Sequence, residues 1–251
     1  MADYTTIVVD DGGPIAKITL NRPEKRNPID PAMCGELVAA LRGVQANVVV
    51  LTGAGNVFSA GGNLGGMQQQ AGTQPASLVE MFTAMHELGK PIIAMVNGHA
   101  LAGGLGLVVA CDVAIVADTA QLGTTEIGVG LWPMMITAEI TRNIGRKKAL
   151  EMMLTGRKMS AAEALALGLV TRVVPAAELE AETMKLAQEL ADKSPSTLAL
   201  GLRAFYRSQD MDLEPALRYL EGELGRVLAT EDAREGIAAF MMKRKPVWKG
   251  R

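Results

Sequence analysis

Residues 92–106, IIAMVNGHALAGGLG, place a short apolar run directly before a turn of small residues. A continuous apolar run of this length is typical of a strand that is buried on both faces of a parallel sheet. The glycines that follow allow the backbone to turn tightly and let another group approach it closely. A helix is predicted to follow over residues 104–110. The same order recurs at residues 47–63, NVVVLTGAGNVFSAGGN, so the chain repeats a buried strand followed by a small-residue turn.

Strands and helices alternate outward from this stretch. Further strands are predicted at residues 113–116 and, as a hairpin, at 5–9 and 15–20. A helix is predicted after Asp30, whose side chain can cap it, with Pro31 at its first position. Another is expected around residues 77–88. Alternating strands and helices with buried strands favour an α/β fold with parallel pairing.

The pattern changes after residue 126, because almost all of the remaining chain has helical periodicity. Only residues 170–174 suggest one more short strand. Helices are predicted over 137–144, 146–154, 161–167, 179–190, 196–207, 214–228 and 231–242. We therefore expect an α/β body over residues 1–195 and a helical tail over residues 196–251.

The composition excludes several classes of protein. The 251 residues are 49% hydrophobic and carry a net charge of −2, which rules out a mainly disordered chain and argues against a nucleic-acid partner. No apolar stretch reaches the ~20 residues of a membrane helix, and the acidic start is unlike a secretory signal. Cys34 and Cys111 are expected to be buried free thiols in a reducing compartment, the cytoplasm. His86 and His99 belong to no cluster of metal ligands, so no metal site is expected.

Two small-residue turns are candidates for binding an oxygen anion. Residues 58–64, FSAGGNL, follow the strand that ends at Thr52, and residues 97–106 follow the strand that ends at Val96. The peptide N–H groups of Ala60 and Gly103 could point at one oxygen, and Gly103 would lie at the positive end of a helix. From spacing alone, tight strand–helix packing explains these glycines equally well.

These motifs resemble the crotonase superfamily of acyl-CoA enzymes, which includes enoyl-CoA hydratases and enoyl-CoA isomerases. The resemblance covers nearly the whole chain. It rests on residues 20–27 (LNRPEKRN), 58–64, 96–104 (VNGHALAGG), 111–112, 121–126 (QLGTTE), 154–156 and 240–245 (FMMKRK). It implies a spiral of ββα units with a C-terminal helical subdomain that forms trimers, often paired into hexamers. It also implies that the amides of Ala60 and Gly103 hold the thioester oxygen of an acyl-CoA.

The resemblance further implies where coenzyme A binds. Coenzyme A is part of the substrate, and no prosthetic group is expected. The segment formed by Lys25, Arg26 and Asn27 matches residues that contact the nucleotide and pantetheine. Phe240 and Lys243 match residues that a neighbouring subunit offers to coenzyme A. The charges at residues 243–245 are equally consistent with a helix C-terminus that complements its dipole.

The acid–base groups indicate the reaction. Family hydratases use two glutamates: Glu126 matches the later one, whereas Gly106 stands at the position of the earlier one. Adding water to a double bond requires two acid–base groups, but moving a double bond from the 3,4 to the 2,3 position requires only one. The favoured function is therefore 3,2-enoyl-CoA isomerisation, with Glu126 as the sole proton shuttle. The alternatives are a specialised enoyl-CoA hydratase and a non-catalytic CoA-binding or RNA-associated paralogue.

The remaining candidate residues concern the acyl group. Asn63, Leu64, Gly106 and Trp132 are expected to line the acyl pocket, with Gly106 one helical turn beyond Gly103 and facing the acyl chain. Asn63 stands where many members of the family have aspartate. Trp132 could equally be a plain core residue.

Overall fold

The computed structural model describes residues 4–62 and 77–251 and contains a large sheet of six strands. Its order is β1-β2-β3-β5-β7-β10, with β1 and β2 antiparallel and every other pair parallel. The strands span Ile7–Asp10 (β1), Ile15–Leu20 (β2), Val48–Gly53 (β3), Ile92–Val96 (β5), Val113–Ala117 (β7) and Arg172–Val174 (β10). The predicted hairpin and the three predicted buried strands are therefore confirmed.

A second, smaller sheet has the order β4-β6-β8-β9. Its strands span Val57–Ser59 (β4), His99–Leu101 (β6), Gln121–Gly123 (β8) and Met159–Ser160 (β9), and the first three run parallel. The chain visits the two sheets in turn: β3 then β4, β5 then β6, and β7 then β8. Each pair leads toward a helix, which makes a spiral of ββα units. None of the small-sheet strands was predicted, because two or three residues are too few to show a period.

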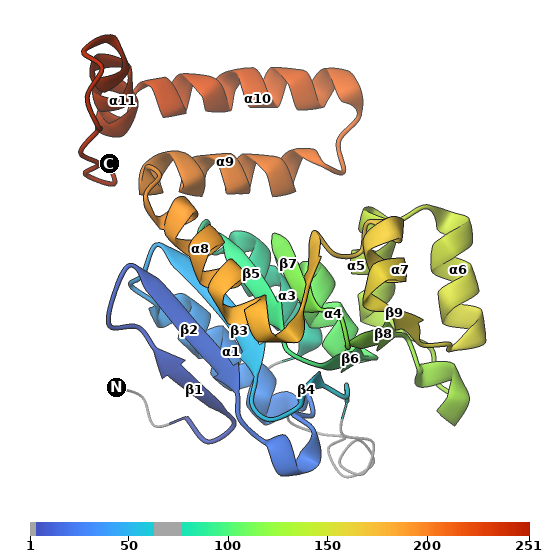
Figure 1. Ribbon diagram of the computed structural model, residues 1–251. Coiled ribbons are helices and arrows are strands. Elements are labelled where there is room, and N and C mark those ends of the chain that lie inside the picture. Colours follow the sequence, from blue (N-terminus) through green and yellow to red (C-terminus); the bar gives the residue numbers. More distant parts are fainter. Residues whose placement is uncertain (1–3, 63–76) are drawn as a thin grey trace.

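Helices cover both faces of the large sheet (Figure 1). One face packs against α1 (Pro31–Gly43), α3 (Leu78–Glu87) and α4 (Gly103–Ala110), and the other is covered by α8 (Leu179–Ala191). The sequence of β3 is continuously apolar because its side chains are buried on both faces of the sheet. Val49 and Leu51 belong to the first core, whereas Val48 and Val50 belong to the core beneath α8.

The predicted helical C-terminal part is present. It comprises α5 (Met134–Asn143), α6 (Arg146–Thr155), α7 (Ala161–Leu167), α9 (Pro195–Ser208), α10 (Leu213–Leu228) and α11 (Glu231–Met241). Short 3-10 turns lie at η2 (Glu126–Val129) and η3 (Ala176–Glu178), and a further one, η1 (Pro23–Lys25), lies between β2 and α1. In Figure 1, α10 and α11 lie on the far side of α9 from the sheets. No helix within residues 4–62 and 77–251 has the length and apolarity needed to span a membrane.

Candidate active site

The three segments singled out in the sequence follow three adjacent strands of the small sheet. Residues 60–62 follow β4, Gly103 follows β6 and Glu126 follows β8, and these strands are neighbours with the same direction (Figure 1). The Ala102 N–H also donates to the Gly123 carbonyl oxygen at 2.8 Å, which holds the second and third segments together. Ligands of α/β proteins bind at the carboxyl edge of such strands. The fold therefore gathers these segments at one edge.

Ala60 is not available as a donor to a substrate. Its N–H donates to the carbonyl oxygen of Arg26 at 2.9 Å. A donor that is already paired within the protein cannot hold a thioester oxygen without losing that bond. The prediction for Ala60 is therefore corrected, and the residue belongs to the support of the site.

Gly62, which sequence reasoning missed, lies beside Gly103. A Cβ atom at position 103 would lie 3.8 Å from the Gly62 nitrogen and 3.8 Å from Gly61 Cα. Within the described part of the chain, the Gly62 N–H has no hydrogen-bond acceptor. Gly103 is the first residue of α4, so its N–H has no partner inside the helix. Two neighbouring free N–H groups are what an oxyanion site requires.

The backbone at this point is strained. Ala102 has φ 50° and ψ −126°, which is unusual for a residue with a side chain. Gly61 has φ 92°, and a Cβ there would lie only 2.5 Å from Ala102 Cβ and 3.1 Å from the Gly103 nitrogen. Glycine at position 61 is therefore required for the two turns to touch. Strain of this kind costs about 1–3 kcal/mol and is typical of functional sites.

Glu126 is a half-buried carboxylate with an unused oxygen. Its Oε2 is buried and has no hydrogen-bond partner among the described residues. Burial raises the pKa of the Glu126 carboxyl above its ordinary value, and a hydrogen bond from its own backbone N–H offsets part of this rise. A carboxylate with these properties is a candidate general base.

The segment that carries Glu126 is positioned by its neighbours on both sides. Leu131 N–H donates to the Glu126 carbonyl oxygen at 3.1 Å, which closes the turn after it. Gly156 ends α6 with φ 62°, and a Cβ there would lie 2.6 Å from Cγ2 of Ile127. Thr124 Oγ1 donates to the Met152 carbonyl oxygen at 3.2 Å. The motif at residues 154–156 thus supports the Glu126 segment.

Gly106 does not face open space. A Cβ at this position would lie 2.3 Å from Cγ2 of Ile136, so the side-chain space is filled by α5. The expectation that Gly106 leaves room for an acyl chain is therefore wrong. A glutamate side chain at position 106 would collide with Ile136 for the same reason.

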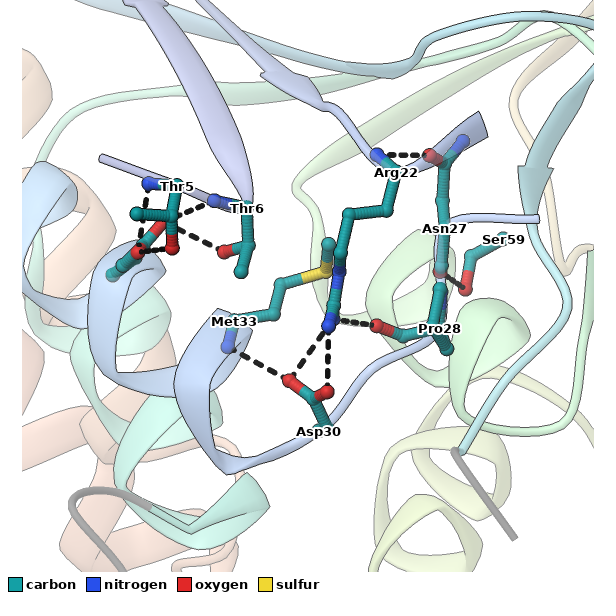
Figure 2. Close-up of polar contacts among 9 residues, drawn as sticks. Thr5, Thr6, Arg22, Asn27, Pro28, Asp30, Met33 and Ser59 are labelled. Carbon is teal, nitrogen blue, oxygen red and sulfur yellow. Dashed lines mark hydrogen bonds and ion pairs between the residues drawn. The ribbon is translucent and has the colours of Figure 1, made fainter. Parts of the chain in front are cut away.

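The loop between β2 and α1 is held by ion pairing and backbone contacts (Figure 2). Arg22 donates to both carboxylate oxygens of Asp30, at 2.6 and 2.9 Å, and to the Pro28 carbonyl oxygen at 2.6 Å. Burial by itself raises the pKa of Asp30, but hydrogen bonds from Arg22 and Met33 keep it below its ordinary value. Asp30 also caps α1 by accepting the Met33 N–H, as predicted.

Asn27 is part of this scaffold rather than a contact for coenzyme A. Its side chain is fully buried, with Nδ2 donating to the carbonyl oxygens of Ala54, Val57 and Phe58 and Oδ1 accepting the Arg22 N–H. Its φ of 50° suits asparagine better than most residues. The coenzyme A assignment of the Asn27 side chain is therefore corrected. Lys25 and Arg26, by contrast, are exposed on the same loop.

The other candidate residues are dispersed. Phe240 lies on α11 and is 85% exposed, and Lys243 follows it with φ 52°; Figure 1 shows α11 far from β4 and β6 of the same chain. Trp132 is partly buried against the main core. Asn63 and Leu64 lie outside the described residues.

The two cysteines and His86 have structural roles in packing. Cys34 and Cys111 are buried free thiols, as predicted, and burial raises the pKa of both. The His86 ring stacks on Tyr206 with the ring centres 4.4 Å apart. Over residues 4–62 and 77–251, no cluster of histidine, cysteine and carboxylate side chains could hold a metal ion.

Comparison with known proteins agrees with this geometry. The family model described as enoyl-CoA hydratase/isomerase matches residues 10–251. The human protein named enoyl-CoA hydratase domain-containing protein 3, mitochondrial, is 38% identical over 93% of this chain and 80% of its own. Its solved structure superposes with a TM-score of 0.89 at 35% identity, over 97% of this chain and 100% of the solved one.

A second solved structure extends the likeness. An enoyl-CoA hydratase from Geobacillus kaustophilus is 35% identical and superposes with a TM-score of 0.91 over 100% of both chains. The spiral of ββα units is therefore the crotonase fold. The members of the family that match are named as enzymes, and the chain belongs to the enoyl-CoA hydratase/isomerase family.

Proposed function

We propose that the protein is a 3,2-enoyl-CoA isomerase in which Glu126 transfers the proton. The observation that carries this proposal is the buried Oε2 of Glu126, which has no hydrogen-bond partner in residues 4–62 and 77–251, together with the filled side-chain space at Gly106. One carboxylate is enough for isomerisation. It removes a proton from the α-carbon of a 3-enoyl thioester, the electron pair shifts so that the double bond moves from C3–C4 to C2–C3, and the same carboxyl returns the proton to the γ-carbon.

The enolate formed in between carries negative charge on the thioester oxygen. The N–H groups of Gly62 and Gly103 are the proposed donors to that oxygen, because they are neighbours and unpaired within the described chain. The positive end of α4 favours the same charge. Removal of one such donor typically costs ~10²–10³-fold in kcat.

Coenzyme A is proposed to bind as part of the substrate. Lys25 and Arg26 are exposed on a loop whose backbone is fixed by Arg22, Asn27 and Asp30, so their positive charges lie on a rigid support. A cation favours the phosphates of coenzyme A. Because the Arg26 carbonyl oxygen accepts the Ala60 N–H, this loop is also joined to the oxyanion segment.

Enoyl-CoA hydration is the second candidate, and the names of the relatives are consistent with it. Hydration would need a further group to handle water or the α-proton. Glu126 would have to do both tasks or share them with bound water.

The deciding experiment compares two substrates with the wild-type protein and the Glu126→Gln variant. We expect a short 3-enoyl-CoA to be converted to the 2-enoyl-CoA faster than the 2-enoyl-CoA is hydrated. The Glu126→Gln change should reduce isomerisation by ~10²–10⁴-fold. Hydration at an ordinary rate together with absent isomerisation in the wild type would replace this function with the second candidate.

A further inference from the structure

The side chain of Ile136 occupies the space of a missing side chain on another helix. Gly106 is buried in α4, and a Cβ there would lie 2.3 Å from Ile136 Cγ2, 3.2 Å from Ile136 Cβ and 3.2 Å from Phe82 Cζ. Ile136 comes from α5 and Phe82 from α3, and both belong to the main core. Three helices therefore meet at Gly106, a position of α4 that has no side chain of its own.

The position of Ile136 is linked to both parts of the site. Its contact partner Gly106 lies in the first turn of α4, the helix that begins with Gly103. Its own helix follows the turn that carries Glu126, which the Leu131 N–H closes on the Glu126 carbonyl oxygen. Ile136 thus packs against the helix with the oxyanion donor, and it belongs to the helix that follows the segment with the base.

Because Ile136 fills the space beside Gly106, this space cannot hold the water molecule that hydration requires. Hydration adds a water proton to C2 and the hydroxyl to C3 of a 2-enoyl thioester, so it needs a bound water and a group to activate it. A water molecule needs room and two or more polar partners. The space beside Gly106 holds a methyl group and a phenyl ring edge, which offer neither. Isomerisation needs no water and is not affected.

We propose that Ile136 is a specificity-determining residue that restricts this site to isomerisation by excluding any polar group from position 106. The inference rests on the proposed function. It assigns Ile136 a positioning role, because it acts through the space beside Gly106 and not by contact with the reacting atoms. It also predicts that residues 106 and 136 must be changed together to change the reaction.

The test compares four variants with the wild type. Gly106→Glu is made alone, and Ile136→Ala alone removes Cγ2. The pair Gly106→Glu with Ile136→Ala introduces the carboxylate and removes the methyl group that blocks it. The matched control is Gly106→Glu with Ile136→Val, because valine keeps Cγ2 and loses only the terminal methyl. Each protein is assayed for hydration of a 2-enoyl-CoA, isomerisation of a 3-enoyl-CoA and thermal unfolding.

Overpacking should lower the Tm of Gly106→Glu by about 2–12 °C. The alanine pair should regain part of that loss, whereas the valine pair should not. The ratio of hydration to isomerisation should rise by at least ~10-fold in the alanine pair, a part of the ~10²–10⁴-fold that a placed acid–base group contributes. It should not rise in Ile136→Ala alone or in the valine pair.

Two results would overturn the role of Ile136. One is a ratio in Gly106→Glu alone, or in the valine pair, that equals that of the alanine pair. The other is an alanine pair that folds with a restored Tm and shows no gain in hydration. Failure of the proposed function is separate, because it shows in the wild type as absent isomerisation. In that case the hydration rates of the alanine and valine pairs, compared directly, still decide the role of Ile136.

Discussion

The hydroxyl group of Tyr206 on α9 donates a hydrogen bond to Asp112 Oδ1 at 2.6 Å and so joins the helical tail to the α/β body. Asp112 follows α4, and its other oxygen accepts the Ile92 N–H of β5 at 2.7 Å. Burial raises the pKa of Asp112, while the hydrogen bonds from Tyr206 and Ile92 partly offset the rise. One partly buried carboxylate therefore connects the tail to the strand that leads into the candidate site.

Tyr206→Phe is expected to reduce the free energy of unfolding by about 1–3 kcal/mol, because Asp112 keeps its burial and loses a donor. The pKa of Asp112 would then rise further in the folded state. A folded-state pKa above the unfolded value favours folding at low pH, and this contribution is lost as the pH rises. The deficit of Tyr206→Phe should therefore be largest near pH 7 and shrink toward pH 4, as measured by urea unfolding. A deficit independent of pH would contradict this account.

Glu126→Gln tests the proton transfer itself. The amide keeps the shape and removes the base, so kcat for the native acyl-CoA reaction should fall by ~10²–10⁴-fold. Glu189→Gln is the matched control, because Glu189 is an exposed glutamate on α8. Wild-type turnover by Glu126→Gln on every accepted acyl-CoA would show that another group is the base.

Activity should fall on acidification at a higher pH than an ordinary glutamate predicts. Glu126 acts as a base only when deprotonated, and burial raises its pKa above 4.5. As the pH falls through that raised pKa, the active fraction decreases, so the half-point of kcat/KM against pH should lie above 4.5. This acidic limb should be absent from the residual activity of Glu126→Gln.

The same burial predicts an effect on stability. Because the folded-state pKa of Glu126 is raised, its favourable contribution is present below the unfolded pKa and is lost as the pH rises. Replacing it with glutamine removes a half-buried charge whose Oε2 has no hydrogen-bond partner among the described residues. Glu126→Gln should therefore have a Tm at pH 7 equal to or higher than that of the wild type. The difference should disappear toward pH 4 in calorimetry. A lower Tm at pH 7 would show that the carboxylate stabilises the fold.

Substitutions of Asn27 and Lys25, which lie on the same loop, should have different effects. The change at Asn27 should lower stability, and the change at Lys25 should weaken ligand binding. Asn27→Ala leaves buried carbonyl oxygens of residues 54, 57 and 58 without their donor, so it should cost more than about 2 kcal/mol of unfolding free energy. Lys25→Ala should leave stability within about 0.5 kcal/mol and weaken binding of an acyl-CoA in a salt-dependent way. Calorimetry and a titration with an unreactive acyl-CoA distinguish the two roles.

The tail is expected to form an interface between copies of the chain. Along α10, a stripe of leucines is exposed: Leu213, Leu217, Leu220, Leu224 and Leu228. Apolar stripes of this size mark interaction surfaces. We predict a homotrimer or hexamer by light scattering, and Leu217→Glu with Leu224→Glu should dissociate it. A wild-type monomer at working concentration would reject this prediction.

The sequence alone determined the layer architecture and identified the candidate base. The continuous apolar runs at β3, β5 and β7 predicted buried parallel strands because both faces of each are covered. Glu126 was found from the motif that carries it, and its burial agrees with the expected role. Asp30 was identified as a helix cap from its position before Pro31, since capping depends on a few neighbouring residues.

Only the tertiary structure decided which backbone groups are free and which spaces are filled. The sequence suggested that the Ala60 N–H could bind a substrate oxygen, but it donates to the carbonyl oxygen of Arg26, which is distant in the chain. The N–H that lies beside Gly103 is instead that of Gly62. The missing side chain at Gly106 suggested an open pocket, but Ile136 fills it. Hydrogen-bond partners and packing between helices depend on contacts between distant segments. Local patterns of residue type do not encode these contacts, because many partners satisfy the same pattern.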